Sequence, residues 1–243
     1  MRVLTIFLLF ISFLFSEEII CPLKPDPPPS IDGDLTDWIM VPVRYEIKGE
    51  NVVYGKNKWK NEKDLSGTIF LSWKNEGLYI GLEVIDDKIV QNLTGKDLWK
   101  GDHIEIYIDT KYSQDAKGIF GEGQFQIGLS PGNLLNTGDP IIDIPPEYYI
   151  FHPENFVSKE KIIVASKKTE EGYNLEAFIP FKLLKIEAKE GKIIGIDICI
   201  SDTDTPDIQE KMASLIKDKE WKCRERSRLL PLKFSSASIS IVK

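Results

Sequence analysis

The stretch TIFLSWKNEGLYIGLEVID, residues 68–86, has the pattern of a β-hairpin. Residues 68–73 and 78–86 are rich in β-branched, aromatic and leucine side chains, and the KNEG between them supplies the glycine that short turns favour. Residues 161–168 (KIIVASKK) and 173–181 (YNLEAFIPF) repeat the arrangement around TEEG. Because such short turns join antiparallel neighbours, both pairs predict an antiparallel sheet.

Strict alternation indicates further strands. In residues 192–201, isoleucines take the even positions from 194 to 200, whereas Gly195, Asp197, Cys199 and Ser201 take the odd ones. Successive side chains of a strand point to opposite faces, so the isoleucines would lie in a core and the other set would face water or a ligand. Similar runs occupy residues 104–109, 123–129 and 237–242. Together these strands predict an all-β fold, an antiparallel β-sandwich.

One segment predicts a helix. Residues 205–219 (TPDIQEKMASLIKDK) begin with Thr205 as N-cap and a proline at the first helical position, and their apolar side chains share one stripe. No Gly/Ser-rich linker divides the body of the chain. We therefore expect one β-sandwich domain over residues 30–243, with one short surface helix and long loop insertions at 44–66 and 130–160.

The N-terminal segment has the features of a secretory signal. Arg2 precedes the apolar run VLTIFLLFISFLF, and Ser16 and two glutamates follow it. The run is shorter than the roughly 20 residues of a membrane-spanning helix. We expect a signal peptide over residues 1–16 and an extended, Pro-rich leader over residues 17–29. The protein would then be secreted or periplasmic, with a membrane partner only through an uncleaved signal.

Composition and cysteine number exclude some classes of protein. The chain has 38 acidic and 31 basic residues and no basic cluster, so a nucleic-acid partner is not expected. Three cysteines, Cys21, Cys199 and Cys223, are too few for a disulfide scaffold. Two alternatives stay open for Cys199 and Cys223: one disulfide bridge, or two free buried thiols.

The sequence lacks the motifs of the common catalytic sites. Its two histidines, His103 and His152, do not form an HExxH motif, and GxSxG, Walker and GxGxxG sequences are absent. A glycosidase needs two suitably spaced carboxylates, but a chain with this many acidic residues always offers such pairs. We therefore expect a protein that is not an enzyme.

Acidic residues gather at three places. Asp32, Asp34 and Asp37 lie close together near the start of the expected domain, and the acidic residues at 86–87 and 202–204 follow strands. Carboxylate and backbone oxygens are the ligands that calcium prefers. Aspartates in turns also bond to the local backbone, which is the alternative to a metal. We predict structural calcium as the one candidate cofactor, with Asp32, Asp34 and Asp37 as its ligands.

Aromatic residues suggest a saccharide ligand. Trp59, Trp99 and Trp221 each lie in polar, lysine-containing surroundings, unlike Trp38 and Trp73. Exposed aromatic faces stack against sugar rings while neighbouring polar groups bind the hydroxyls. The alternative is that each of these tryptophans covers a hydrophobic edge. The loop IPPEYYIFHPENF (144–156) adds aromatics that would either wall a binding face or fasten the loop to the core.

Five stretches, taken together and in this order, resemble the family 9 carbohydrate-binding modules, which are DOMON-like β-sandwiches. They are SIDGDLTDW (30–38), LSWKNEGLYIGLEVIDD (71–87), LWKGDHIEIYID (98–109), YNLEAFIPFKLL (173–184) and IGIDICISDTD (194–204). The resemblance implies an antiparallel β-sandwich, often with bound calcium, that is exported with glycan-degrading enzymes. In sugar-binding members, two tryptophans enclose the terminal sugar and polar side chains bind its hydroxyls.

Three positions match the sugar-binding residues of the family. Trp99 matches the tryptophan before the family's D-x-x-E strand, Glu105 matches the strand glutamate, and Trp221 matches the second stacking tryptophan. Alternation in residues 103–109 places the isoleucines inward and Glu105 on the opposite face. The resemblance thus implies that Trp99, Glu105 and Trp221 form one binding surface.

Other positions depart from the family pattern. Gln126 and Gly128 stand where sugar-binding members have an arginine and an asparagine, and Cys199 stands where they have a glutamine. We include Gln126 in the expected carbohydrate site as a hydroxyl partner. The departures remove hydrogen bonds worth about 1–3 kcal/mol each when charged groups are involved.

The expected function is non-catalytic carbohydrate binding that supports polysaccharide breakdown or uptake. The partners would be an oligo- or polysaccharide and a glycan-degrading enzyme. One alternative, also implied by the resemblance, is a periplasmic redox subunit that binds haem b through methionine and lysine, for which Met40 and Met212 are available. The other is a structural or adhesion module without a small ligand.

Overall fold

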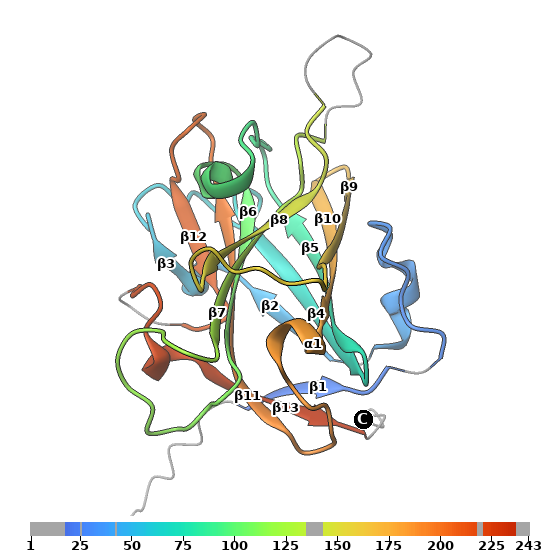
Figure 1. Ribbon diagram of the computed structural model, residues 1–243. Coiled ribbons are helices and arrows are strands. Elements are labelled where there is room, and N and C mark those ends of the chain that lie inside the picture. Colours follow the sequence, from blue (N-terminus) through green and yellow to red (C-terminus); the bar gives the residue numbers. More distant parts are fainter. Residues whose placement is uncertain (1–17, 25, 42, 135–142, 218–220, 237–243) are drawn as a thin grey trace, which may run out of the picture.

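A computed structural model of the chain describes residues 18–24, 26–41, 43–134, 143–217 and 221–236. Two β-sheets face each other in it, and the other segments connect the strands at both ends (Figure 1). This architecture confirms the predicted all-β sandwich.

The smaller sheet contains both predicted hairpins. Its strands, in the order β2-β4-β5-β10-β9, are antiparallel throughout. They are β2 (Arg44–Ile47), β4 (Ser66–Lys74), β5 (Gly77–Ile85), β9 (Ile163–Lys168) and β10 (Gly172–Pro180). Since β10 pairs with β5, the two hairpins lie side by side.

The larger sheet has the order β1-β13-β11-β6-β7-β8, with β12 pairing β11 and β3 pairing β12. Its strands are β1 (Ile19–Pro22), β3 (Val52–Tyr54), β6 (His103–Asp109), β7 (Gln124–Ser130), β8 (Glu147–His152), β11 (Ile193–Asp202), β12 (Lys211–Ser214) and β13 (Leu230–Ser235). The helical elements are short: α1 (Phe181–Leu184) and the 3-10 turns η1 (Leu35–Met40), η2 (Gly49–Asn51), η3 (Gly95–Lys100) and η4 (Arg226–Arg228).

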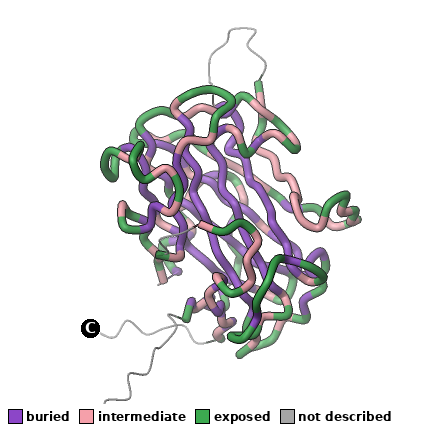
Figure 2. The backbone as a smooth tube through the Cα atoms, turned by 90° about the vertical axis from the view of Figure 1, so that its left-hand side faces the viewer, coloured by how far each residue is buried: buried purple, intermediate pink, exposed green. Residues whose placement is uncertain are grey.

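The core lies between the two sheets. The even-numbered isoleucines of β6 and β11 are all fully buried there, and Leu82 and Val84 of β5 join the same cluster. Figure 2 shows the buried strands in the middle of the molecule and the exposed segments around them. The period-two pattern read from the sequence therefore identified the inward-facing residues of these strands.

The outer face of β6 is also buried, contrary to the simple alternation of a solvated sheet. His103, Glu105, Tyr107 and Asp109 are at most 5% exposed. The segment 221–229 lies over this face, and its Leu229 is part of a second apolar cluster with Tyr107. Both faces of this strand thus lie within the folded protein.

The predicted helix at 205–219 is wrong. A turn at residues 205–208 leads into β12, which pairs with β11 so that Lys211 lies opposite Asp202. The side chain of Lys211 is fully buried and forms ion pairs with Asp64 and Asp202. Tertiary pairing therefore overrides the local helical pattern, and α1 follows β10 at a place where no helix was predicted.

The N-terminal part of the sheet begins before the expected domain boundary at residue 30. β1 pairs in parallel with β13, and its Ile19 and Cys21 are buried in the core. Residues 19–22 are therefore a strand and not part of a free leader. The expected signal peptide 1–16 and the predicted strand 237–242 lie outside the described residues.

Three further outcomes concern loops, cysteines and membrane spans. The expected loop insertions contain β2 and β3 (44–66) and β8 (130–160), so they contribute to the sheets. Cys21, Cys199 and Cys223 are free thiols, which excludes the bridged alternative for the last two in this structure. Within the described part of the chain, no helix is long and apolar enough to cross a membrane.

Candidate functional site

Glu105 lies in a polar cluster on the outer face of the larger sheet. Its carboxylate accepts hydrogen bonds from the Tyr107 hydroxyl and from Gln126 Nε2, the latter at 3.1 Å. His103 Nε2 lies 3.7 Å from the same carboxylate. Adjacent strands position this set, because Tyr107 of β6 is directly opposite Gln126 of β7. The structure therefore brings together two residues of the expected site, Glu105 and Gln126.

The surroundings keep Glu105 charged. Burial by itself would raise the pKa of its carboxyl group, but the neighbouring His103, Tyr107 and Gln126 outweigh burial and hold the pKa below its usual value. Burial and the nearby charge of Glu105 raise the pKa of Tyr107, so its hydroxyl stays protonated and donates. The cluster thus offers a fixed anionic acceptor at the surface of the sheet.

Arginines at alternate positions of segment 221–229 reach down to this face. Arg224 Nε donates to Gln126 Oε1 at 2.5 Å, and Arg226 Nη2 lies 2.9 Å from Asp109 Oδ2. Arg228 Nη2 lies 4.0 Å from Asp197 Oδ2. The segment is not a regular strand, since Arg224 lies in a turn with a positive φ and the other two arginines begin and end η4. The three arginines nevertheless meet three polar partners on the sheet. We call residues 221–229 the arginine segment.

The two tryptophans of the expected site differ in their environment. Trp221, at the start of the arginine segment, packs against the cluster of Tyr107, Phe120, Cys199, Met212 and Leu229. Trp99 lies on η3, is 39% exposed and has Lys100 Nζ 5.7 Å from its ring centre. The η3 turn packs against β7 and β8. Trp221 is therefore half-buried against this apolar cluster, whereas Trp99 presents a more open ring on η3.

Little space is left beneath the arginine segment. The cavity bordered by Tyr107, Asp197 and Arg228 has a volume of about 10 Å³, room for a single water molecule. Gly128, next to Glu105 across the strands, has no room for a side chain, since an added Cβ would lie 2.6 Å from Phe151 and 2.9 Å from Leu98. The position of the family's asparagine is thus filled by β8 and η3.

A second hollow lies on the opposite side of the molecule, on the outer face of the smaller sheet. It has a volume of about 330 Å³ and is lined by Trp38, Ile39, Arg44, Phe70 and Asn174 among others. The Arg44 guanidinium lies 5.5 Å from the ring centre of Phe70. This hollow combines an aromatic face with polar groups, so it is a rival location for a sugar.

Asp32, Asp34 and Asp37, the expected calcium ligands, are used for local bonds. Asp34 caps η1 by accepting from Thr36 N at 3.1 Å and also pairs with Lys167 at 3.0 Å. Asp37 accepts from the backbone of Ser30, and Asp32 accepts from the backbone of Asp34. The structure shows no convergence of the three carboxylates, and calcium there stays a prediction. The Glu176 carboxylate instead ties this turn to the sheet, accepting from the backbone N–H groups of residues 32 and 33 and from Trp38 Nε1.

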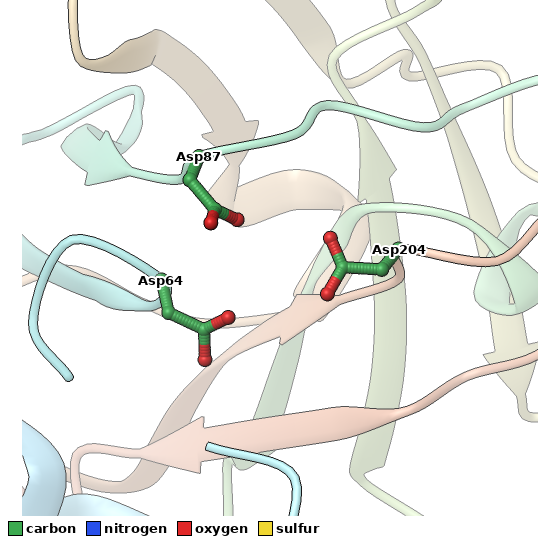
Figure 3. Close-up of side chains that lie close together, drawn as sticks. All are labelled: Asp64, Asp87 and Asp204. Atoms are coloured by element: carbon green, nitrogen blue, oxygen red, sulfur yellow. The ribbon is translucent and has the colours of Figure 1, made fainter. Parts of the chain in front are cut away.

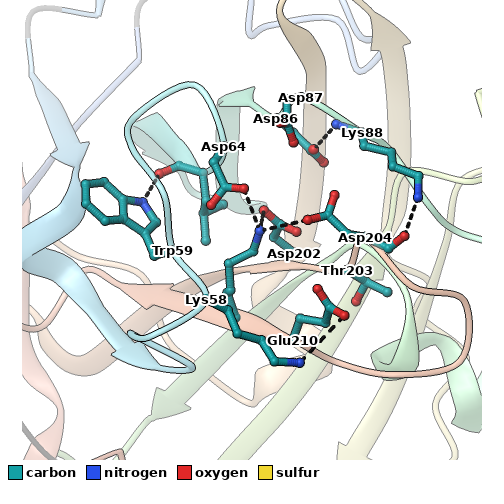
Figure 4. Close-up of polar contacts among 12 residues, drawn as sticks. Lys58, Trp59, Asp64, Asp86, Asp87, Lys88, Asp202, Thr203, Asp204 and Glu210 are labelled. Carbon is teal, nitrogen blue, oxygen red and sulfur yellow. Dashed lines mark hydrogen bonds and ion pairs between the residues drawn. The ribbon is translucent and has the colours of Figure 1, made fainter.

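Three other carboxylates do converge. The side chains of Asp64, Asp87 and Asp204 point toward one another, with one oxygen of each within 4.8 Å of the others (Figure 3). Lys60 Nζ lies 3.0 Å from Asp64, 3.7 Å from Asp87 and 3.4 Å from Asp204. Lys211 Nζ lies 2.8 Å from Asp64 and 3.3 Å from Asp204. Figure 4 shows these two carboxylates among the polar residues around them. Two ammonium groups lie among these three carboxylates, and we call Asp64, Asp87 and Asp204 the lysine-bridged cluster.

The family model described as carbohydrate family 9 binding domain-like matches residues 31–223. The chain belongs to this family. Membership confirms the prediction that the protein is a non-catalytic carbohydrate-binding module and not an enzyme. No curated protein sequence matches the chain.

Solved structures of similar fold include a family 9 carbohydrate-binding module from Caldicellulosiruptor kristjanssonii. Its complex with cellotriose has a TM-score of 0.65 and 16% sequence identity, and the match covers 93% of this chain and 98% of that one. Its complex with glucose has a TM-score of 0.66 and 15% identity, with 93% and 100% covered. At this level of identity the likeness shows a shared fold.

Two residues of the polar cluster in this family 9 module were missed by sequence reasoning. Tyr107 alternates with Glu105 on the same face, so periodicity alone could have included it. Arg224 comes from a segment about 100 residues farther along the chain, and it brings a guanidinium to Gln126, the position where the family arginine is replaced. The repeated arginines of CRERSR are the signal that could have pointed to it.

Proposed function

We propose that this family 9 module binds the end of a glucose-based saccharide chain at the edge of the arginine segment. The observation that carries the proposal is the convergence of Glu105, Gln126 and Arg224 beside Trp221. A carboxylate, an amide and a guanidinium are the groups that bind sugar hydroxyls, and an aromatic ring supplies the stacking face. The module of similar fold from Caldicellulosiruptor kristjanssonii, solved with cellotriose and with glucose, supports this ligand class.

The ligand must bind at the rim of the cluster, because the space beneath the arginine segment holds only a water molecule. The Arg224 guanidinium donates there to Gln126 Oε1 and, at 3.3 Å, to the carbonyl oxygen of Phe151. Sugar hydroxyls would replace these contacts with hydrogen bonds of the same kind, so the exchange costs little. The exposed ring of Trp99 would then be available for stacking.

Calorimetry with cellotriose and glucose, together with tryptophan fluorescence, tests the proposal. We expect saturable binding, which Glu105→Gln and Trp221→Ala each weaken by about tenfold or more, because a charge-assisted hydrogen bond or a stacking face is lost. Tyr54→Ala is the control, since Tyr54 is an exposed aromatic residue of β3 that lies outside the cluster.

Two results would contradict the proposal. A folded protein that binds neither these sugars nor any member of a glycan panel would favour the structural or adhesion alternative. Binding that survives Glu105→Gln and Trp221→Ala but is lost in Arg44→Ala would move the site to the hollow on the smaller sheet.

Export and an enzyme partner complete the proposed role. The signal-like residues 1–16 support secretion, and a module without catalytic motifs would act beside a glycan-degrading enzyme. Mass spectrometry of the exported protein should show a chain that begins close to Glu17. A mature protein that still carries residues 1–16 would contradict cleavage and indicate membrane attachment.

A further inference from the structure

The outer face of the larger sheet extends beyond Glu105 to the edge strand β8. Glu105 of β6 lies opposite Gly128 of β7, and Gly128 lies opposite Tyr149 of β8. Residues that are directly opposite share a face, so Tyr149 lies on the same face as Glu105, two strands away. Neighbouring strands are about 4.8 Å apart, which places the backbones of these two residues roughly 10 Å from each other. A short oligosaccharide spans such a distance.

A β-bulge brings a second aromatic side chain of β8 to this face. The register of β7 and β8 shifts between Gln126 and Ile127, and the pairing skips Phe151. Bulges turn side chains away from the regular alternation and are frequent at sheet edges and beside functional sites. The ring of Phe151 lies over Gly128, where an added Cβ would be 2.6 Å from Phe151 Cε2. Phe151 therefore covers the stretch of outer face that separates the sugar site from the edge of the sheet.

The side chains of β8 divide into two sets. Tyr148 and Ile150 pack against the core cluster, so they fasten the strand to the sandwich. Tyr149 and Phe151 are half-buried, and their ring centres lie 4.9 Å apart at an interplanar angle of 60°. This edge-to-face contact fixes both rings while part of each residue stays accessible to solvent. We call Tyr149 and Phe151 the β8 aromatic pair.

Two segments of the proposed sugar site adjoin the β8 aromatic pair. Arg224 Nη2, from the arginine segment, donates to the carbonyl oxygen of Phe151 at 3.3 Å. Gly95 N of η3, the turn that carries the exposed tryptophan, donates to Glu147 Oε1 at 2.7 Å. Tyr149 lies on β8 midway between Glu147 and Phe151. The aromatic pair is therefore continuous with the sugar site on the same face of the sheet.

We propose that the β8 aromatic pair is a second sugar subsite, so that affinity increases with the length of the saccharide chain. This inference rests on the proposed function, in which the chain end lies at the cluster of Glu105, Gln126 and Arg224. The following sugar units then lie over Phe151 and Tyr149. Sugar rings present apolar C–H faces that stack on aromatic rings. Because neighbouring groups already fix both aromatic rings, little conformational entropy is lost when a sugar covers them.

The chemistry of this surface indicates neutral sugar units. The two aromatic rings carry no charge, and the carboxylate of Glu147 beside them accepts a hydrogen bond from the backbone of η3. Tyr149 adds a hydroxyl group, which both donates to and accepts from sugar hydroxyls. A neutral, linear, glucose-based chain therefore fits the second subsite better than an anionic glycan does.

Calorimetric titration of the full-length protein with glucose, cellobiose and cellotriose tests the second subsite. We expect the wild-type protein to bind cellotriose about tenfold more tightly than glucose, because further sugar rings are stacked. Tyr149→Ala should bring the two affinities to within about threefold of each other. Tyr149→Phe keeps the aromatic ring and should keep the tenfold ratio. Tyr54→Ala, which removes an exposed aromatic residue of β3, is the control and should alter neither affinity.

Saturation-transfer NMR of cellotriose with the wild-type protein is a second measurement, which needs no variant to fold. Protons of at least two sugar rings should receive saturation, since one ring lies at the chain-end cluster and another on the β8 aromatic pair. Equal affinities for glucose and cellotriose, saturation of a single ring, or an equal loss of both ligands in Tyr149→Ala would overturn the second subsite while the chain-end site stands. If the folded protein binds none of the three sugars, the proposed function fails and this inference fails with it.

Discussion

Lys211 is the residue on which the interior charge balance depends most directly. Its side chain is fully buried between Asp64 and Asp202, both of which are also buried. Burial alone would lower the pKa of Lys211, but these carboxylates outweigh burial and raise it, so the ammonium stays charged. We predict that Lys211→Met lowers the free energy of unfolding by about 3–5 kcal/mol, since it leaves buried carboxylates without their cation. Urea unfolding followed by circular dichroism measures the change.

Lys60 provides the matched control for this prediction. It contacts Asp64 at 3.0 Å, yet its own side chain is 56% exposed. Lys60→Met should therefore cost less than about 1 kcal/mol, as is usual for an exposed ion pair. If both variants lost the same free energy of unfolding, burial would not determine how strongly these lysine–aspartate ion pairs stabilise the protein.

Single residues show how far sequence reasoning reaches. Glu105 and Gln126 were placed together correctly because each follows from the periodicity of its strand and from the family resemblance. Arg224 and Lys211 were not predicted, since their partners are set by how distant segments fold over the sheet. Period-two patterns define a face, but they carry no information about which loop will cover it.

At the scale of elements, β1 is the strand that was not predicted from the sequence. The prolines after residue 21 suggested an extended leader, but IICP (19–22) pairs in parallel with β13. A strand of four residues has too little length for a periodic signal. Similarly, the apolar spacing in residues 205–219 fitted a helix, whereas β12 forms there because it can pair with both β11 and β3. Short elements of this kind are decided by their neighbours.

The pairing of β1 leads to a prediction. Ile19 is 2% exposed and belongs to the core, whereas Ile20 points away from it and is half-buried. Ile19→Ala should lower the free energy of unfolding by about 2–5 kcal/mol, because it opens a cavity in packed core. Ile20→Ala should cost clearly less on the same strand. Urea unfolding of both variants checks this, and equal losses would contradict the alternation that the structure gives β1.

At the scale of the whole molecule, the sandwich keeps an apolar core in its middle and places ionisable groups at one end of it. The strands supply the apolar part through inward isoleucines, leucines and valines. Where the strands end, Asp86, Asp102 and Asp202 occupy the buried positions that follow the apolar residues. These ionisable groups therefore make the stability of the domain depend on pH.

That dependence has a definite sign. Burial is the main cause that raises the pKa of Asp86 to about 6 and that of Asp202 to about 8, against roughly 3.9 in an unfolded chain. Burial and the charge of Asp86 also raise the pKa of Asp102. Lys211 and Asp204 are the other charged groups facing Asp202, and they act in opposite directions. Between about pH 4 and pH 8 these carboxyl groups therefore bind more protons in the folded protein than in the unfolded chain, so their contribution to stability falls as pH rises.

We predict that the melting temperature decreases from pH 5 to pH 8.5, because the carboxyl groups at the end of the core lose their protons in the folded protein over this range. Asp202→Asn should flatten this pH profile, because it removes the carboxyl group whose pKa is raised to about 8, above that of Asp86. Thermal melts monitored by circular dichroism across this range provide the measurement. A melting temperature that rises with pH over this range would show that these carboxyl groups are ionised in the folded protein, and would contradict the predicted loss of stability.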